Sequence, residues 1–295
     1  MSKTGTGQPA FFSAQIEGAR RFYRDPASVH RAALAVLCGG CEQCAPQYEI
    51  HRRSFPYRGL EYVVQGSGRL ILKGVEYPLV AGTVFVYGPG IPQDITTDPR
   101  APLVKYFVDF SGTSASRVLL EAGITAGCVF QTSAPGDIMA VFDDLIRAGL
   151  RDTPYAPRIL AILLELLVQR LAETRIPFGS AGTPAFETYR RCRQAMDERW
   201  GEWSTLEQVA AACHVDAAYI CRLFRRFDHA SPYQHLLRRR MNDAARRLQA
   251  AGASVKLVAE NLGFSDPFHF SRVFKKVMGV SPSHYTGMRS RTRAR

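Results

Sequence analysis

The sequence predicts two domains: an N-terminal all-β barrel or jelly roll with following helices, and a C-terminal all-α domain with two helix-turn-helix units. A chain of 295 residues is long enough for about two domains. Residues 31–110 contain short strand-like segments, whereas an amphipathic helical pattern occurs twice between residues 206 and 282. From Tyr189 onward there are 20 Lys and Arg against 9 Asp and Glu, which accounts for most of the net charge of +12. This concentration of positive charge is the footprint expected of a nucleic-acid-binding domain.

Residues 1–30 precede the first predicted strand. They are rich in Gly, Ser and Thr at first and then become aromatic and basic. We expect an arm or a short helix that packs on the domain that follows. The segment has no signal-peptide pattern, and no window of the chain reaches the roughly 18 apolar residues of a membrane span. These features predict a cytoplasmic protein with no membrane partner.

Five short segments have the β-branched and aromatic composition of strands and are separated by turns with Gly or Pro. The segments are 33–37, 60–64, 68–72, 83–87 and 104–108. Strands of this length and spacing predict a barrel or sandwich, whose mouth can hold one small ligand. The polar side chains that we expect to contact such a ligand are Arg53, Tyr62, Gln93 and Tyr106.

Seven cysteines are spread over the chain, and Cys38, Cys41 and Cys44 have the spacing C-x2-C-x2-C. Thiolates at this spacing can share a metal ion or form a redox site. The set lacks a second well-spaced pair. We therefore favour the other interpretation, which is reduced cysteines around a turn at Gly39-Gly40.

Two amphipathic helices are predicted after the barrel, over residues 137–149 and 157–173, beyond a connection of uncertain structure at 111–136. The apolar stripe of the second helix is broad enough to face two surfaces. It can pack on the barrel or form a dimer interface, and both interpretations stay open. Pro, Gly and Ser then mark a linker. The predicted division is 1–136 for the arm and the effector-binding barrel, 137–176 for a helical segment that can form a dimer interface, 177–186 for the linker and 187–295 for the DNA-binding domain.

An internal repeat is the strongest signal in the chain. The segment 216–227, followed by Ser231-Pro232, is written again as 266–277, followed by Ser281-Pro282. In both copies apolar residues recur at i, i+3, i+4 and i+7, and the opposite face is basic. Each copy follows another short amphipathic helix and a tight turn, so each is predicted to be a helix-turn-helix unit.

The repeat also predicts how its helices begin. Asp216 and Asp266 suit the N-cap, and Pro267 suits the first helical position. The outward residues near the start of each helix should meet base edges, and residues further along should meet phosphates. Arg222 and Arg272 can each bind a guanine, whereas Ala218 and Phe268 offer apolar contact, such as to a thymine methyl. The predicted DNA-binding residues are Ala217, Ala218, Cys221, Arg222, Arg225, Arg226, Pro267, Phe268, Ser271, Arg272, Lys275 and Lys276.

From about Trp203 to Tyr285 the chain resembles the DNA-binding domain of the AraC-type (AraC/XylS) transcription regulators. The segments 263–276 and 279–282 carry the resemblance most closely. It implies two helix-turn-helix units joined by a long helix, here predicted over residues 233–250. The first unit departs from the family pattern, with His214 and His229 where glycine is usual. We expect left-handed turn positions there, which histidine tolerates. The tail with Arg289, Arg291, Arg293 and Arg295 is expected to be disordered and to add nonspecific attraction.

Residues 62–68, 82–83 and 88–93 resemble the cupin-like sensor domain of the same family. A metal-binding cupin has two histidines on one strand, a glutamate and a further histidine downstream. This chain has no H-x-H, and Gln93 occupies the downstream position. An amide is a poor ligand for a transition metal but a good hydrogen-bonding partner. We therefore expect no metal, no cofactor and no catalytic residue.

The predicted function is a sequence-specific transcription regulator that binds double-stranded DNA and responds to a small-molecule effector held in the barrel. The resemblance implies a sugar as effector, a homodimer and RNA polymerase as a partner. Two other functions stay open: a metal-dependent cupin enzyme with an appended DNA-binding domain, and an effector-independent architectural DNA binder. The sequence identifies neither the effector nor the operator, and it does not separate an activator from a repressor.

Overall fold

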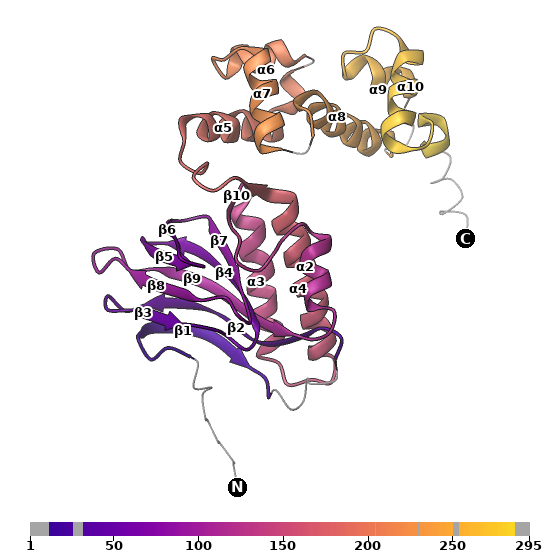
Figure 1. Cartoon of the computed structure of the whole chain (residues 1–295). Coiled ribbons are helices and arrows are strands. Elements are labelled where there is room, and N and C mark those ends of the chain that lie inside the picture. The colour runs from indigo at the N-terminus through magenta and orange to yellow at the C-terminus, as the bar shows by residue number, and fades with distance from the viewer. Residues whose placement is uncertain (1–11, 26–31, 204, 229, 250–253, 287–295) are drawn as a thin grey trace. The chain divides into compact units, whose positions relative to one another are not determined.

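The computed structural model describes residues 12–25, 32–203, 205–228, 230–249 and 254–286. The chain forms two compact units, Met1–Ala181 and Gly182–Arg295 (Figure 1). The first unit combines strands with helices, and the second is helical. The division between them falls in the Gly-rich stretch before helix α5, which begins at Pro184. His229 and the arginines from Arg289 onward, for which the sequence suggested a turn and a disordered tail, lie outside the described residues.

The N-terminal unit contains two antiparallel sheets. The seven-stranded sheet has the order β1-β2-β9-β4-β7-β10-β11, and the four-stranded sheet has the order β3-β8-β5-β6. The strands are β1 Ile16–Tyr23, β2 Ala35–Cys44, β3 Glu49–Arg52, β4 Arg58–Gln65, β5 Gly68–Leu72, β6 Val75–Leu79, β7 Thr83–Tyr87, β8 Gln93–Thr97, β9 Val104–Ser111, β10 Val129–Thr132 and β11 Arg175–Ile176.

The two faces of the seven-stranded sheet are buried in different ways. Alternate residues of each strand point to opposite faces. On β4, Leu60 and Tyr62 belong to the cluster that packs on the helices, whereas Val63 belongs to the cluster between the two sheets. Helices α3, Pro135–Gly149, and α4, Ala156–Thr174, cover the outer face (Figure 1). The space between the sheets is therefore the interior of the barrel, and the helices stand outside it.

The segment before the first predicted strand is itself a strand. An arm or short helix was expected, but β1 pairs antiparallel with β2 from Ile16↔Cys44 to Tyr23↔Cys38. Strand β2 is ten residues long, and an open strand edge leaves backbone donors and acceptors without partners. Pairing with β1 satisfies that edge. The sequence does not indicate this strand, because most residues of β1 are exposed and the segment lacks the alternation of apolar and polar residues that marks a strand.

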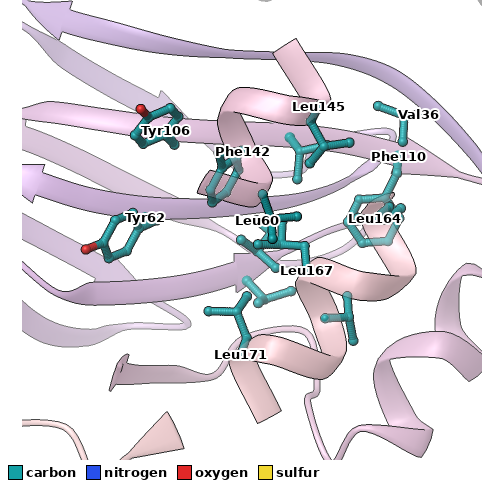
Figure 2. Close-up of a cluster of buried hydrophobic side chains, with 14 of the residues drawn as sticks. Val36, Leu60, Tyr62, Tyr106, Phe110, Phe142, Leu145, Leu164, Leu167 and Leu171 are labelled. Carbon is teal, nitrogen blue, oxygen red and sulfur yellow. The ribbon is translucent and has the colours of Figure 1, made fainter. Parts of the chain in front are cut away.

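The connection of uncertain structure at 111–136 contains two elements. Helix α2 spans Ala115–Glu121, and β10 adds a strand beside β7. The apolar residues of α2, Val118 and Leu119, join the cluster beneath α3 and α4. Figure 2 shows this cluster, in which Leu164 and Leu167 of α4 face Leu60 and Phe110 of the sheet. The connection is therefore part of the core of the unit.

The C-terminal unit has two helix-turn-helix pairs at opposite ends of one long helix, α8 (Figure 1). The first pair is α6 with α7, and the second is α9 with α10. Tyr189 of α5 packs its ring on Phe224 and Phe227 of α7, at centroid distances of 5.2 and 5.5 Å. The helices are α5 Pro184–Glu198, the 3-10 helix η1 Trp200–Glu202, α6 Leu206–Ala212, α7 Ala217–Phe227, α8 Pro232–Leu248, α9 Val255–Asn261 and α10 Pro267–Met278.

Side-chain caps fix where these helices begin. Thr205 and Ser231 each form a capping box, with Gln208 and Gln234 respectively. Asp266 accepts bonds from two backbone amides at the start of α10, whereas Asp216 makes no side-chain cap bond. The turn between α6 and α7 places His214 at φ 53, the left-handed conformation expected from the sequence. Thr183 and Ser254 also accept a backbone bond at the starts of α5 and α9, so five of these helices begin at a side-chain cap.

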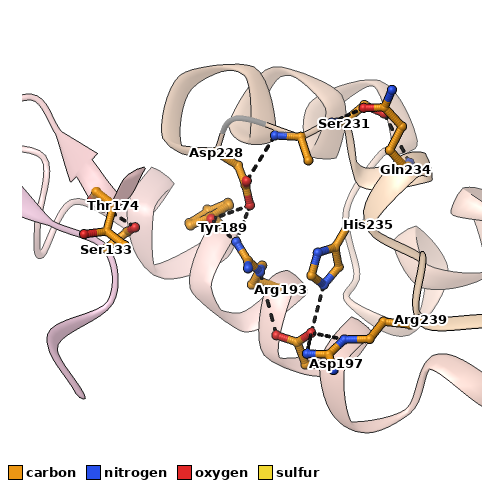
Figure 3. Close-up of polar contacts among 11 residues, drawn as sticks. Ser133, Thr174, Tyr189, Arg193, Asp197, Asp228, Ser231, Gln234, His235 and Arg239 are labelled. Atoms are coloured by element: carbon orange, nitrogen blue, oxygen red, sulfur yellow. Dashed lines mark hydrogen bonds and ion pairs between the residues drawn. The ribbon is translucent and has the colours of Figure 1, made fainter. Parts of the chain in front are cut away.

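Two carboxylates tie α5 to the neighbouring helices α7 and α8 (Figure 3). Asp228 accepts a bond of 2.8 Å from the Tyr189 hydroxyl and pairs with Arg193. Asp197 lies 2.8 Å from Nε2 of His235 and accepts a bond of 2.9 Å from Nε of Arg239. Burial opposes ionisation of Asp197, but the bonds from His235 and Arg239 outweigh it and lower its pKa to about 2. Helix α5 is thereby tied to both α7 and α8.

Candidate nucleic-acid interface and ligand site

The outer face of α10 is basic, with one large apolar side chain. Phe268 is 78% exposed, and Arg272, Lys275 and Lys276 are exposed beside it. Asp266 accepts hydrogen bonds of 2.8 and 3.0 Å from the amides of Phe268 and of the next residue, which fixes the first turn. The opposite face is buried through Phe270 and Phe274. Helix α10 is therefore anchored by its apolar face and presents cations to solvent.

Helix α7 repeats this arrangement in the first pair. Ala218, Arg222, Arg225 and Arg226 are exposed, and the apolar stripe that begins at Ile220 is buried. The Arg222 guanidinium lies 5.4 Å from the centre of the Tyr219 ring. A cation over an aromatic ring is attracted to the ring face, which restrains the long side chain. The two helices therefore offer similar cationic surfaces with different neighbours.

Four of the expected DNA-binding residues are less exposed than the others. Ala217, Cys221, Pro267 and Ser271 are half-buried. The Ser271 hydroxyl donates a bond of 2.9 Å to the carbonyl of Pro267 one turn earlier. These four residues therefore present less surface to solvent than the arginines and lysines of the same helices.

Tyr219 and His269 occupy equivalent positions in the two copies and were not among the expected residues. His269 is exposed and Tyr219 half-buried, and both stand in the first turn of their helices. Both side chains can donate a hydrogen bond and stack. The repeat could have pointed to these two residues, because both copies have a polar aromatic side chain at this position.

The interior of the barrel holds a buried cluster of charges. Nζ of Lys105 lies 2.8 Å from Oε2 of Glu61 and 3.4 Å from Oε2 of Glu42. The Tyr87 hydroxyl donates a bond of 3.0 Å to Oε1 of Glu61. Each of these side chains is buried. Buried charges are tolerated where partners compensate them, and these residues supply one another's partners.

Asp109 extends this cluster. Sγ of Cys38 donates a bond of 3.1 Å to Oδ2 of Asp109. Burial raises the pKa of Asp109 to about 7; the negative charge of Glu61 adds to this, and the bond from Cys38 opposes it. Burial alone would lower the pKa of Lys105, but Glu61 and other neighbours raise it well above its ordinary value. The interior therefore combines a firmly charged ammonium with a carboxyl group that titrates near neutrality.

A small cavity of about 20 Å³ adjoins this cluster. Phe12, Tyr48, Arg52 and Phe107 line it together with the charged residues. A cavity of that size holds about one water molecule. A larger ligand would enter the barrel only if the side chains of the cluster moved apart.

The four expected effector-binding residues do not meet at this cavity. Tyr62 and Tyr106 face α3, where the Tyr106 ring stacks on Phe142 at 5.0 Å (Figure 2). The Tyr106 hydroxyl donates a bond of 3.0 Å to Asp143. Their sequence neighbours Glu61 and Lys105 face the interior instead. A shift of one residue along a strand moves a side chain to the other face.

Arg53 and Gln93 lie apart from the tyrosines. Arg53 is exposed in the turn after β3. Gln93 is 1% exposed, and neither atom of its amide has a hydrogen-bonding partner among the described residues. Its backbone pairs with Arg52 on one side and Leu72 on the other. The inward-facing residues next to these positions, Glu61, Lys105 and Arg52, are the ones that sequence reasoning missed.

The three clustered cysteines belong to a strand, and the turn expected at Gly39-Gly40 was wrong. All three lie on β2, where Cys44 joins the interior cluster and Cys41 packs with the cluster on the helix side. Residues three apart on a strand point to opposite faces. Within the described parts of the chain, no three His, Cys, Asp or Glu side chains form a group that could hold a metal ion.

Two equivalent basic helix-turn-helix units and a β-barrel with a polar interior define a DNA-binding regulator with a ligand-sensing domain. The comparisons agree with this class. Residues 39–168 match the model of an AraC-like ligand binding domain, and residues 209–288 match the model of a helix-turn-helix domain.

Relatives share most of the length of the chain. The uncharacterized HTH-type transcriptional regulator YisR of Bacillus subtilis is 31% identical over 82% of this chain and 90% of its own. The raffinose operon transcriptional regulatory protein RafR of Pediococcus pentosaceus is 25% identical over 85% of this chain and 92% of its own. Among solved structures, the C-terminal domain of AraT from Geobacillus stearothermophilus is 32% identical, covers 37% of this chain and 88% of that one, and has a TM-score of 0.32.

The chain belongs to the AraC family of transcription regulators. In the part of the chain that the structure describes, no helix combines the length and apolar character needed to cross a bilayer.

Proposed function

We propose that this regulator reads DNA with α7 and α10 and that the residues exposed on these helices make the contacts. Arg222 and Arg272 stand in the second turn of their helices and can bind base edges, whereas Arg225, Arg226, Lys275 and Lys276 lie nearer the helix ends and suit phosphates. The supporting observation is that both helices bury an apolar stripe and expose a cationic face at matching positions.

The effector is proposed to be a small polyhydroxylated molecule, such as a sugar, held inside the barrel. Carboxylates accept bonds from hydroxyl groups, Lys and Arg donate to them, and aromatic rings pack on the carbon skeleton. The interior offers all three kinds of side chain in Glu42, Glu61, Lys105 and Phe107. The name of RafR, a raffinose operon regulator, points to the same chemical class. Binding would replace the ion pairs of the cluster with ligand contacts and so shift the unit between two states.

A homodimer through α4 is part of this proposal. Tyr155, Ile159, Ile162 and Leu166 are exposed by 73%, 43%, 49% and 42%. Their spacing of four, three and four residues forms one stripe, as at a coiled-coil seam. The opposite face of α4, with Leu160, Leu164 and Leu167, is already buried on the barrel. The helix therefore has apolar surface left for a second copy.

The remaining parts of the proposal follow from the family. The relatives are named as transcription regulators, so the barrel is proposed to sense a ligand and to have no catalytic activity. A regulator bound beside a promoter works through RNA polymerase, which we propose as a partner, in the cytoplasm.

The test is DNA binding by the full chain as a function of salt concentration. Because each phosphate contact releases counterions, log K should fall with log salt by about 0.9 for each contact. Lys275→Ala and Lys276→Ala should each reduce that slope by about 1. Arg117→Ala, a change at an exposed arginine of α2, serves as the control and should leave it unchanged. A folded chain with no affinity for duplex DNA in dilute salt would contradict the proposal.

A further inference from the structure

Among the large apolar side chains in the described ranges, Phe268 is the most exposed, at 78%. It stands in the first turn of α10, next to Pro267, and the equivalent residue of α7 is Ala218. The fold gains nothing from a phenyl ring left in water. Its neighbours Phe264 and Phe270 are buried, so the exposure belongs to this one position.

The backbone under Phe268 is held in place. Its amide donates a bond of 2.8 Å to Oδ1 of Asp266. Oδ2 of the same carboxylate lies 3.9 Å from Nη2 of Arg272, whose side chain is 73% exposed. Arg272 follows Phe268 by four residues, so the two side chains share one face of the helix. The contact with Asp266 directs the guanidinium toward the helix N-terminus, along the side on which the phenyl ring stands.

We propose that Phe268 and Arg272 together read a thymine and a guanine that lie within two base pairs of each other. This inference rests on the proposed DNA binding by α10. In the major groove thymine presents a methyl group, and guanine presents O6 and N7 to an arginine. Side chains at i and i+4 are about 5–6 Å apart, and base pairs are about 3.4 Å apart along the axis. The two contacts therefore fall on neighbouring base pairs of the same site.

Charge favours DNA over a protein surface as the occupant of this face. Arg272, Lys275 and Lys276 are all exposed on α10, and the described residues of this helix include no acid. The cations suit the phosphates on either side of the major groove, and the phenyl ring between them suits the methyl group of a thymine. Because phenylalanine forms no hydrogen bond, it distinguishes thymine from cytosine through the methyl group alone. At the equivalent position of the first unit, the methyl group of Ala218 does not reach as far.

The experiment begins with selection of duplex sites from random sequence by the full chain. In the selected site each thymine is replaced singly by deoxyuridine, which removes only the methyl group, and each guanine by 7-deazaguanine, which removes N7. For the wild-type chain, one deoxyuridine should lower affinity about fourfold, the effect of one buried methylene. One 7-deazaguanine within two base pairs of it should lower affinity by about fivefold or more.

Variants then assign the contacts. Phe268→Ala should bind the unmodified site about fourfold more weakly and lose its sensitivity to that deoxyuridine, whereas Arg272→Ala should lose its sensitivity to the 7-deazaguanine. Leu257→Ala removes another exposed apolar side chain of the unit and should keep both sensitivities. Unchanged melting temperatures would show that the variants fold.

The inference is overturned if every deoxyuridine leaves wild-type affinity within about twofold, since a buried methylene is worth more than that. It is also overturned if Phe268→Ala keeps the wild-type sensitivity. If no sequence is enriched and the chain binds no duplex, the proposed function itself fails and takes this inference with it. The two failures are distinguishable, because only the second abolishes binding to unmodified DNA.

Discussion

Lys105 and Glu61 form an ion pair of 2.8 Å inside the N-terminal barrel, and each side chain is only 3% exposed. The two residues lie on adjacent strands, β9 and β4, and both point away from the helices. Glu42 on β2 shares the same ammonium at 3.4 Å. Nη1 of Arg21 also lies 3.1 Å from Oε1 of Glu42, so Lys105 is the cation of Glu61 and shares Glu42 with Arg21.

Removal of this cation should destabilise the unit. Lys105→Met leaves Glu61 buried without its cation, whereas Glu42 keeps its pair with Arg21. Breaking one partner of a buried ion pair costs about 3–5 kcal/mol. Adding Glu61→Gln should restore part of the loss, because one buried charge is then absent. Hydrogen exchange of the β4 and β9 amides at increasing urea concentration would measure the change in unfolding free energy. The control is Arg69→Met, which breaks an exposed pair with Glu76 and should cost less than about 1 kcal/mol. Equal effects of both changes would contradict the expectation.

The Asp109 carboxyl should make the stability of the unit depend on pH. Its pKa is about 7 in the folded chain, above its ordinary value of 3.8, because it is buried. The folded state then holds a proton that the unfolded state releases, so stability falls as pH rises from about 4 to 7 and is level above that. The slope approaches about 1.4 kcal/mol per pH unit.

Asp109→Asn should remove this slope. The difference in unfolding free energy between wild type and variant is to be measured from pH 4.5 to 8, with a change at the exposed Asp152, Asp152→Asn, as control. Because Glu61, Lys105 and Tyr87 adjoin Asp109, the measured midpoint belongs to the cluster. A difference that stays constant over the whole range would show that Asp109 is ionised throughout.

The turn of the first helix-turn-helix pair should gain stability from glycine. His214 has φ 53, and the equivalent residue of the second pair, Gly263, has φ 74. A side chain in this conformation costs about 1 kcal/mol. His214→Gly is therefore expected to stabilise the C-terminal unit by up to about 1 kcal/mol, and Gly263→Ala to destabilise it by a similar amount. Trp200 and Trp203 both lie in this unit, so their fluorescence during urea unfolding reports it. Opposite signs for the two changes are required.

The stripe on α4 should hold the dimer together. Ile162→Asp places a charge in its centre and should convert the chain to a monomer, because a buried unpaired carboxylate is costly. Light scattering after size-exclusion chromatography gives the mass directly. The control Leu120→Asp changes another exposed aliphatic side chain of the unit, on α2, and should leave the mass at that of the wild-type dimer. A monomeric wild type, or a dimer that survives Ile162→Asp, would rule out this interface.

The sequence alone determined the helical half of the protein. The apolar spacing from Ile220 to Phe227, the cap at Asp266, and Pro267 at a first helical position are signals between residues a few positions apart. Such signals act before any tertiary contact forms, because a helix satisfies its backbone bonds within one segment. The repeat then fixed which helices form equivalent pairs.

Only the tertiary structure decided the interior of the barrel. A strand bonds to partners far away in the chain, so the sequence does not show that residues 16–23 complete the edge of β2. It does not show which face of β4 meets the helices either. There Tyr62 packs on α3, and its neighbour Glu61 meets Lys105 between the sheets. Cys41 and Cys44 lie on opposite faces of β2 for the same reason. Side chains alternate along a strand, and the pairing of distant strands chooses which alternate set becomes the interior.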